Sequence, residues 1–221
     1  MELVLVARRG DRLEALAREL TNVRVEALTA NLADPAARQR VEQRLAADDE
    51  PVDLLVNTAG VGGSGAFVDL PVADEEDTVL VNALAPTRLC HAALTAMDRR
   101  GRGAILNVSS VAGLVPAFPG SATYAATKAY LCSLSESLRM ECRARRSPVR
   151  VTVVCPGYVR TDMTRAVGLP SIAWVSRENV VRDALRGLDR NRPVVVPGLL
   201  YKATRALPRP LLRLGAALAP K

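Results

Sequence analysis

The sequence predicts an α/β fold in which a doubly wound parallel sheet is covered by helices on both faces. Short apolar runs alternate with longer segments of helical periodicity along the chain, which is the pattern of repeated β-α-β units. Runs such as 52–56 carry apolar residues on both faces, as strands between two helix layers do. At 221 residues, 49% of them hydrophobic, the chain suits one domain with a substantial core.

Each element follows from one of two local patterns. The expected strands are short runs rich in Val, Leu and Ile, and the expected helices carry apolar residues at helical spacing. In chain order, we expect a strand at 3–7, a helix at 11–20, a strand at 23–28, a helix at 35–46, a strand at 52–56, a helix at 75–97, a strand at 104–109, a helix at 122–145, a strand at 149–155, a helix at 178–188 and a strand at 193–196.

The most informative local feature is Tyr124, which Lys128 follows at a spacing of four. Residues four apart share a helix face, so we expect the Lys128 ammonium beside the Tyr124 phenol, where it would lower the phenol's pKa from about 10. Ser110 ends the apolar run 103–110, which has the composition of a buried strand, and ligands bind where such strands end. Ser110 would then hydrogen-bond the oxygen that Tyr124 protonates. An ordinary surface pair is the alternative, because the spacing alone is a weak motif.

The formal charge of +7 is concentrated near the C-terminus. Between Arg190 and Lys221 all charged residues are basic, so positive and negative charges balance over residues 1–189. This distribution, together with only 3% aromatic residues, argues against a nucleic-acid partner.

We therefore expect a single domain at 1–198 and a basic, Leu-rich tail at 199–221. The tail mixes Leu with Arg and is suited to peripheral membrane contact, or to docking on its own domain or on a partner subunit. The opening run 3–7 is too short to span a bilayer and is followed by charged residues, so we expect neither a transmembrane segment nor a signal peptide.

The cysteines and the histidine indicate which metal sites and catalytic triads the chain can form and whether its compartment is reducing. The four cysteines, at 90, 132, 142 and 155, lack the paired spacing of a metal site, so we expect reduced thiols in a cytoplasmic protein and no metal. His91 is the only histidine, which argues against a Ser-His-Asp triad and a multi-histidine metal site.

Four further motifs accompany Tyr124 and Lys128 in a fixed order: Asn57-Thr-Ala-Gly60 after a strand, Asn82 within 81–86, Asn107-Val-Ser-Ser110, and Cys155-Pro-Gly-Tyr-Val-Arg-Thr-Asp-Met163. Singly, each has an ordinary structural explanation as a turn, a helix polar group or a strand terminator. As an ordered set they resemble the short-chain dehydrogenase/reductase family, from residue 1 to about residue 165. Thr58 stands where the family usually has a second Asn.

The resemblance implies a Rossmann-like fold with a hydride-transfer site. By resemblance, Tyr124 is the acid in carbonyl reduction and the base in alcohol oxidation, Lys128 lowers its pKa and binds ribose hydroxyls, and Ser110 polarises the substrate oxygen. Asn82 would complete the catalytic set by holding a relay water. The cofactor-binding residues implied in the same way are Arg8, Arg9, Asn31, Leu32, Asn57, Ala59, Gly60, Tyr124, Lys128, Pro156, Gly157, Val159 and Thr161, the last two holding the nicotinamide carboxamide.

Two basic residues bear on the choice of cofactor. NAD-selective enzymes place an acidic residue after the strand that 3–7 would represent, whereas Arg accommodates a 2′-phosphate. Arg8 and Arg9 stand there, so NADP(H) is expected over NAD(H). Asn31-Leu32 replaces the Asp-Leu that the family usually sets beside the adenine.

The sequence lacks the Thr-Gly-x-x-x-Gly-x-Gly turn with which the family begins. The run 3–7 corresponds to the family's second strand, so we expect the first βα unit, about 30 residues, to be missing from this chain. Since that strand is central in the order 3-2-1-4-5-6, its two neighbours would lose their shared partner.

The leading functional hypothesis is an NADP(H)-dependent oxidoreductase that interconverts a carbonyl and an alcohol. A non-catalytic interaction protein that no longer binds the dinucleotide is the alternative, favoured by the absent glycine turn. An epimerase or dehydratase is disfavoured by the short C-terminal region. Apolar residues after Thr161 suggest a lipophilic substrate, and the resemblance implies a homodimer or homotetramer built on the helices of Asn82 and Tyr124.

Overall fold

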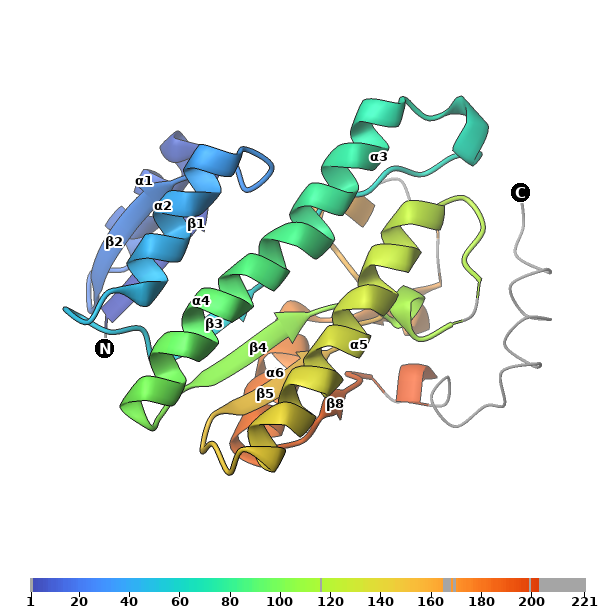
Figure 1. Ribbon diagram of the computed structural model, residues 1–221. Coiled ribbons are helices and arrows are strands. Elements are labelled where there is room, and N and C mark those ends of the chain that lie inside the picture. Colours follow the sequence, from blue (N-terminus) through green and yellow to red (C-terminus); the bar gives the residue numbers. More distant parts are fainter. Residues whose placement is uncertain (1, 116, 165–167, 169, 199, 203–221) are drawn as a thin grey trace.

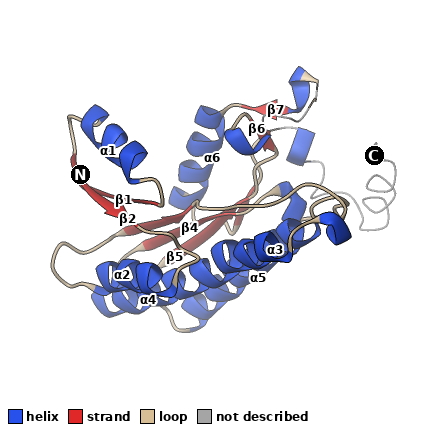
Figure 2. Ribbon diagram, turned by 90° about the horizontal axis from the view of Figure 1, so that it is seen from above, coloured by secondary structure: helices blue, strands red, loops and turns tan. Residues whose placement is uncertain are grey.

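The computed structural model describes residues 2–115, 117–164, 168, 170–198 and 200–202, and these form the predicted doubly wound α/β fold (Figure 1). Helices lie on both faces of the strands, as Figure 2 shows. One face carries α1 (Gly10–Glu19) and α6 (Arg177–Asp189). The other carries α2 (Pro35–Ala46), α3 (Val72–Val79), α4 (Ala85–Arg100) and α5 (Ala122–Ala144).

All paired strands run parallel. β1 (Glu2–Ala7) pairs with β2 (Arg24–Thr29), and a separate group has the order β3 (Leu54–Asn57), β4 (Ala104–Val108), β5 (Arg150–Val154), β8 (Val194–Val195). A two-residue pair that we did not expect, β6 (Tyr158–Val159) with β7 (Trp174–Val175), lies beyond the carboxyl end of β5. Parallel strands end at one edge of the sheet, where ligands bind in such folds.

In the part of the chain that the structure describes, β1 and β3 each have one unpaired edge. Among the described residues, β1 is hydrogen-bonded only to β2, and β3 only to β4. Leu54 and Val56 of β3 are 39% and 43% exposed, although both side chains are suited to a buried strand. The expectation that these two strands would lack a shared partner is confirmed for this part of the chain.

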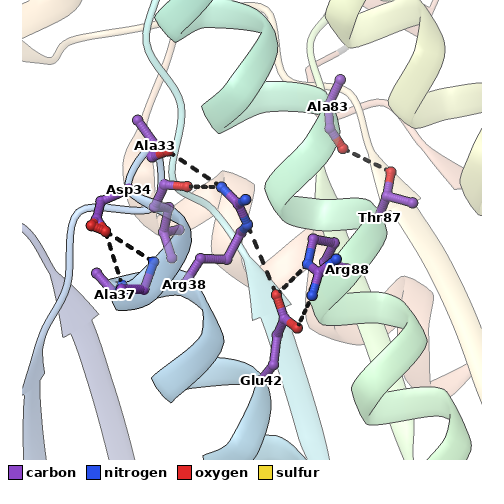
Figure 3. A network of polar contacts seen from close by, with 10 residues as sticks. Ala33, Asp34, Ala37, Arg38, Glu42, Ala83, Thr87 and Arg88 are labelled. Carbon is purple, nitrogen blue, oxygen red and sulfur yellow. Dashed lines mark hydrogen bonds and ion pairs between the residues drawn. The ribbon is translucent and has the colours of Figure 1, made fainter.

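The β1–β2 half is attached to the rest of the domain mainly through α2 and α4 (Figure 3). The Arg38 guanidinium, 6% exposed, forms an ion pair with Glu42 at 3.8 Å and donates a hydrogen bond to the Leu32 carbonyl at 2.8 Å. Glu42 in turn accepts two hydrogen bonds from Arg88 of α4, at 2.6 and 2.7 Å. Beneath this network lies an apolar interface that includes Val41, Leu45, Leu89 and Ala93. One carboxylate therefore links two helices across a shared core.

The helix expected at 75–97 is longer and less regular than predicted. It starts at Val72 and ends at Arg100, with a π-helical segment at Leu80–Leu84 between α3 and α4. Pro86 explains part of the irregularity, because it has no N–H to donate to the carbonyl of Asn82. Such π segments are frequent at functional sites.

The described helices include none that is both long and apolar enough to cross a membrane. The predicted division at residue 198 sets Tyr201 apart from the domain, whereas the structure packs Tyr201, 9% exposed, into the core. Of the predicted tail 199–221, residues 199 and 203–221 lie outside the described residues.

In the 221-residue chain, we expect backbone amide exchange to be faster in β1 and β3 than in β4. Within the described part of the chain, β4 is hydrogen-bonded on both sides, whereas β1 and β3 are bonded on one side only, so smaller openings expose their amides. Residue-resolved hydrogen exchange measures the difference directly. Equal protection in β3 and β4 would show that the outer edge of β3 is covered.

Candidate active site

The predicted site residues lie where parallel strands end. Arg8 and Arg9 follow β1, Asn31 and Leu32 follow β2, residues 57–60 follow β3, Ser110 follows β4, and Pro156 and Gly157 follow β5. Because these strands are parallel, their carboxyl ends form one edge of the fold, and the first turns of α5 lie against its β4–β5 part.

Tyr124 and Lys128 share one face of α5, as their spacing predicts. The Lys128 Nζ lies 5.6 Å from the centroid of the Tyr124 ring and donates a hydrogen bond to the carbonyl of Val108 at 3.0 Å. The Lys128 side chain is buried, with 4% of the residue exposed. This burial lowers the pKa of Lys128 to about 8, while the Cys132 and Cys155 sulfurs favour its charged form.

The Tyr124 hydroxyl meets Ser110, as predicted. Burial raises the pKa of Tyr124, a hydrogen bond from Ser110 opposes this rise, and the nearby Tyr158 adds to it. The expectation that Lys128 lowers the pKa of Tyr124 is wrong for this structure. Burial outweighs the opposing hydrogen bond from Ser110, and the hydrogen bond of the Lys128 ammonium goes to the Val108 carbonyl.

Asn82 is buried with 0% exposure and binds the loop that follows β3. Its Oδ1 accepts a hydrogen bond from Val61 N at 2.9 Å, and its Nδ2 donates to Val61 O at 2.7 Å and to Thr127 Oγ1 at 3.2 Å. The Asn82 side chain thus acts as a clamp between α5 and this loop. The main-chain carbonyl of Asn82 is the group left without its usual i+4 donor, because residue 86 is proline.

Two glycines bring the same loop against the catalytic candidates. A Cβ on Gly60 would lie 3.2 Å from Lys128 Nζ, and one on Gly62 would lie 2.6 Å from Tyr124 Cδ2. Gly60 belongs to the predicted cofactor set, and its neighbour Ala59 is exposed. Gly62 was missed. The Gly-Gly-Ser-Gly run at 62–65 was its signal, because glycine is required where a backbone approaches a ring this closely.

Asn57 belongs to a buried network of side chains below the site. Its Nδ2 donates to Asn107 Oδ1 at 2.9 Å and to the Cys90 sulfur at 3.3 Å. Asn107, with 0% exposure, donates to Ser135 of α5 at 2.8 Å. The Asn57 amide therefore ties β3 to β4 and α4. Asn107, the first residue of its predicted motif, and Ser135, which the sequence did not indicate, are structural residues here.

The loop after β5 is held by its neighbours. A Cβ on Gly157 would lie 2.0 Å from the Tyr201 ring, and the Tyr201 hydroxyl donates to the Ala173 carbonyl at 2.6 Å. Thr164 Oγ1 donates to Val159 O at 2.6 Å and accepts from Thr161 N at 3.0 Å. Pro156 O accepts from Val111 N at 3.0 Å, which joins this loop to the segment that carries Ser110.

Arg8 and Arg9 follow the carboxyl end of β1 and are exposed at the start of α1. Asn31 Oδ1 accepts a hydrogen bond from Ala33 N at 3.2 Å, and Leu32 packs against the core. Asn31 therefore stabilises the turn before α2 through its acceptor, and its amide nitrogen remains a hydrogen-bond donor for a ligand.

Comparison with known proteins agrees with this arrangement. The model of the short chain dehydrogenase family matches residues 1–170. The chain belongs to the short-chain dehydrogenase family. Oxidoreductase UcpA of Escherichia coli K12 is 36% identical over 161 residues, which are 72% of this chain and 60% of that protein. The chain thus spans about three fifths of the length of such curated relatives.

Solved structures extend the likeness over the whole chain. A short-chain dehydrogenase from Sphingobium yanoikuyae in complex with NADPH is 36% identical, with a TM-score of 0.82 over 100% of this chain and 87% of that one. The bulky-bulky ketone specific alcohol dehydrogenase from Comamonas testosteroni is 32% identical, with a TM-score of 0.80 over 100% and 85%. The chain therefore has the fold of this family.

Gly62→Ala is expected to displace the Tyr124 ring while leaving the fold intact. The added methyl would overlap the ring, and overpacking of this kind costs about 1–3 kcal/mol. The tyrosine ¹³Cζ resonance of Tyr124, assigned with Tyr124→Phe, should shift. Gly63→Ala is the matched control, because its methyl would meet Leu70 at an ordinary 3.4 Å. Similar spectra for both variants would contradict the close approach at residue 62.

Proposed function

We propose that the chain carries the catalytic half of an NADP(H)-dependent oxidoreductase that interconverts a carbonyl and an alcohol. The observation that carries this proposal is the meeting of Ser110, Tyr124 and Lys128 at the carboxyl end of β4. A phenol, a hydroxyl and a buried ammonium provide a proton donor, a second hydrogen-bond donor and a positive charge at one place. Charge that develops on a carbonyl oxygen during reduction needs these groups.

The residues present fit the nicotinamide side of a dinucleotide. When bound, the cofactor supplies or accepts the hydride. Lys128, with its pKa lowered to about 8, would hold ribose hydroxyls, and Val159 and Thr161 would hold the carboxamide. Tyr124 would pass its proton to the substrate oxygen, with Ser110 bound to the same oxygen. A water on the Asn82 carbonyl would lie on the relay toward Lys128.

The preference for NADP(H) rests on Arg8 and Arg9. Both are exposed after β1, at the position where family members bind the 2′-hydroxyl or 2′-phosphate of the ribose. The Sphingobium relative was solved with NADPH. Two guanidinium groups at this place would bind a 2′-phosphate through charge-assisted hydrogen bonds, so NADP(H) is our proposed cofactor.

A bulky, apolar carbonyl compound is the proposed substrate class. Met163 and Ile172, which follow the Pro156–Gly157 loop, are 51% and 80% exposed, while Val167 and Leu169 lie outside the described residues. The Comamonas relative is named for bulky-bulky ketones. Trp174 stacks edge-on against Tyr158, and Tyr158 in turn raises the pKa of Tyr124, so this aromatic pair is close to the catalytic phenol.

A homodimer or homotetramer in the cytoplasm is the proposed state. An apolar groove of about 430 Å³ between α3 and α5 is lined by residues that include Val79, Ala83, Ala126 and Tyr130, and it is suited to a second subunit. The basic tail would add peripheral membrane contact.

Tyr124→Phe is expected to lower turnover by about 10²–10⁴-fold while NADPH binding persists, because the proton donor is removed and the ring remains. Reductase assays and NADPH titrations are run on this chain and on a fusion in which a relative's glycine-rich strand-turn-helix precedes it. Tyr130→Phe is the matched control. Tyr130 is an exposed residue of α5, and its hydroxyl forms a hydrogen bond with Thr87 of α4. Undiminished turnover in Tyr124→Phe would remove Tyr124 from its proposed role.

Arg8→Ala with Arg9→Ala is expected to weaken NADPH binding by about 10-fold or more and to leave NADH binding nearly unchanged, because only NADPH carries the 2′-phosphate. Fluorescence titration of the fusion with both cofactors measures the ratio of the two dissociation constants. Arg18→Ala, an exposed arginine at the far end of α1, serves as the control. Equal weakening for both cofactors would contradict the assignment of these arginines to the 2′-phosphate.

A further inference from the structure

Two buried cysteines touch each other directly behind the candidate active site. The sulfurs of Cys132 and Cys155 lie 3.6 Å apart, the van der Waals contact distance of a thiol pair, and neither is in a disulfide. Cys132 is 7% exposed and Cys155 is 0% exposed. Cys132 lies in α5, whereas Cys155 directly follows the last residue of β5, and the two are 23 residues apart in the chain.

Both cysteines adjoin residues of the proposed function. Cys132 is one helical turn after Lys128, and Cys155 directly precedes Pro156 and Gly157. The Cys132 thiol also donates to Ser109 Oγ at 3.2 Å, and Ser109 Oγ donates to the Lys128 carbonyl at 2.7 Å. A change at this sulfur pair therefore reaches the helix turn of Lys128 and the loop after β5.

The geometry points to a reversible modification site: we propose that peroxides oxidise Cys132 and Cys155 to a disulfide that joins α5 to the end of β5. A disulfide requires the sulfurs to close from 3.6 Å to about 2.05 Å. The other two cysteines, Cys90 and Cys142, have no sulfur partner among the described residues, so one pair alone is poised for this reaction.

The chemistry balances with one peroxide for each disulfide. The Cys132 thiolate attacks a peroxide oxygen, the O–O bond breaks, and hydroxide leaves, which gives a sulfenic acid on Cys132. The Cys155 sulfur then attacks the oxidised sulfur, the S–O bond breaks, and the oxygen leaves as water. The two sulfurs lose two electrons in total, which reduce the peroxide, and both thiol protons end in water.

Charges around the pair favour Cys132 as the first sulfur to react. A hydrogen bond from Cys155 and the charge of Lys128 lower the pKa of Cys132, whereas burial and Glu136 of the same helix raise it. Cys132 is also the more exposed of the two sulfurs. The same coupling stabilises the Lys128 ammonium, and a disulfide, which carries no charge, would remove this support.

The test uses the 221-residue chain treated with hydrogen peroxide, alkylated, and analysed by intact and peptide mass spectrometry. We expect a loss of about 2 Da, a linked Cys132–Cys155 peptide, two remaining alkylated thiols, and reversal by dithiothreitol. Cys132→Ser and Cys155→Ser should each abolish the loss, and Cys142→Ser should retain it. Four alkylated thiols after treatment, or a loss that survives in Cys132→Ser, would overturn the proposal.

A second readout tests the link to Lys128. The ¹³Cε resonance of Lys128 should titrate with a lower midpoint in the oxidised chain than in the reduced chain, because the thiolate next to the ammonium has gone. An unchanged midpoint would show that the disulfide does not act on the site. A reversible loss of turnover on oxidation is expected only if the proposed function is correct. If the reduced chain has no turnover, the proposed oxidoreductase function is contradicted, but the disulfide detected by mass spectrometry is not affected.

Discussion

The packing of α5 on the carboxyl ends of β4 and β5 is the constraint on which the rest of this site depends. A sheet and a helix usually meet through apolar side chains, but here the interface carries a chain of buried polar groups. Asn107 donates to Ser135, Ser109 donates to the Lys128 carbonyl, and Lys128 donates to Val108. Each bond has a defined geometry, so the polar groups fix one register of α5 on the sheet. A one-turn slip would leave several buried donors without acceptors, at about 1–3 kcal/mol each.

This register explains how an ammonium is held in a buried position at the site. Lys128 sits where burial lowers its pKa to about 8, and the Val108 carbonyl and the Cys132–Cys155 sulfurs compensate part of the lost hydration. The segment at Val111–Gly113 can approach α5 because Gly113 has no side chain, since a Cβ there would lie 2.5 Å from the Lys128 carbonyl carbon. That approach brings Ser110 to Tyr124. The packing of α5 on the sheet therefore determines both the buried polar interface and the positions of the catalytic candidates.

Much of this was accessible from sequence because local patterns carry it. The alternation of apolar runs and helices predicted the sheet, and the absence of a glycine turn predicted the unpaired edges of β1 and β3. Tyr124, Lys128 and Ser110 were predicted by spacing and by resemblance. The direction in which the pKa of Tyr124 shifts was not predicted, because it depends on how deeply the phenol is buried. Gly62 and Tyr201 were missed for a similar reason: each matters through contacts between segments far apart in the chain.

The two halves of the structure are stabilised by different means, and this bears on how the chain can work. The β3–β4–β5 half contains the buried polar interface and all four catalytic candidates. The β1–β2 half, which carries Arg8 and Arg9, is attached through the α2–α4 interface and its Glu42 bridge. Shifts of the β1–β2 half would therefore move the proposed 2′-phosphate contacts relative to Lys128 without disturbing the contact between Tyr124 and Ser110. Cofactor affinity should accordingly respond to changes at the α2–α4 interface more strongly than the proton-transfer geometry does.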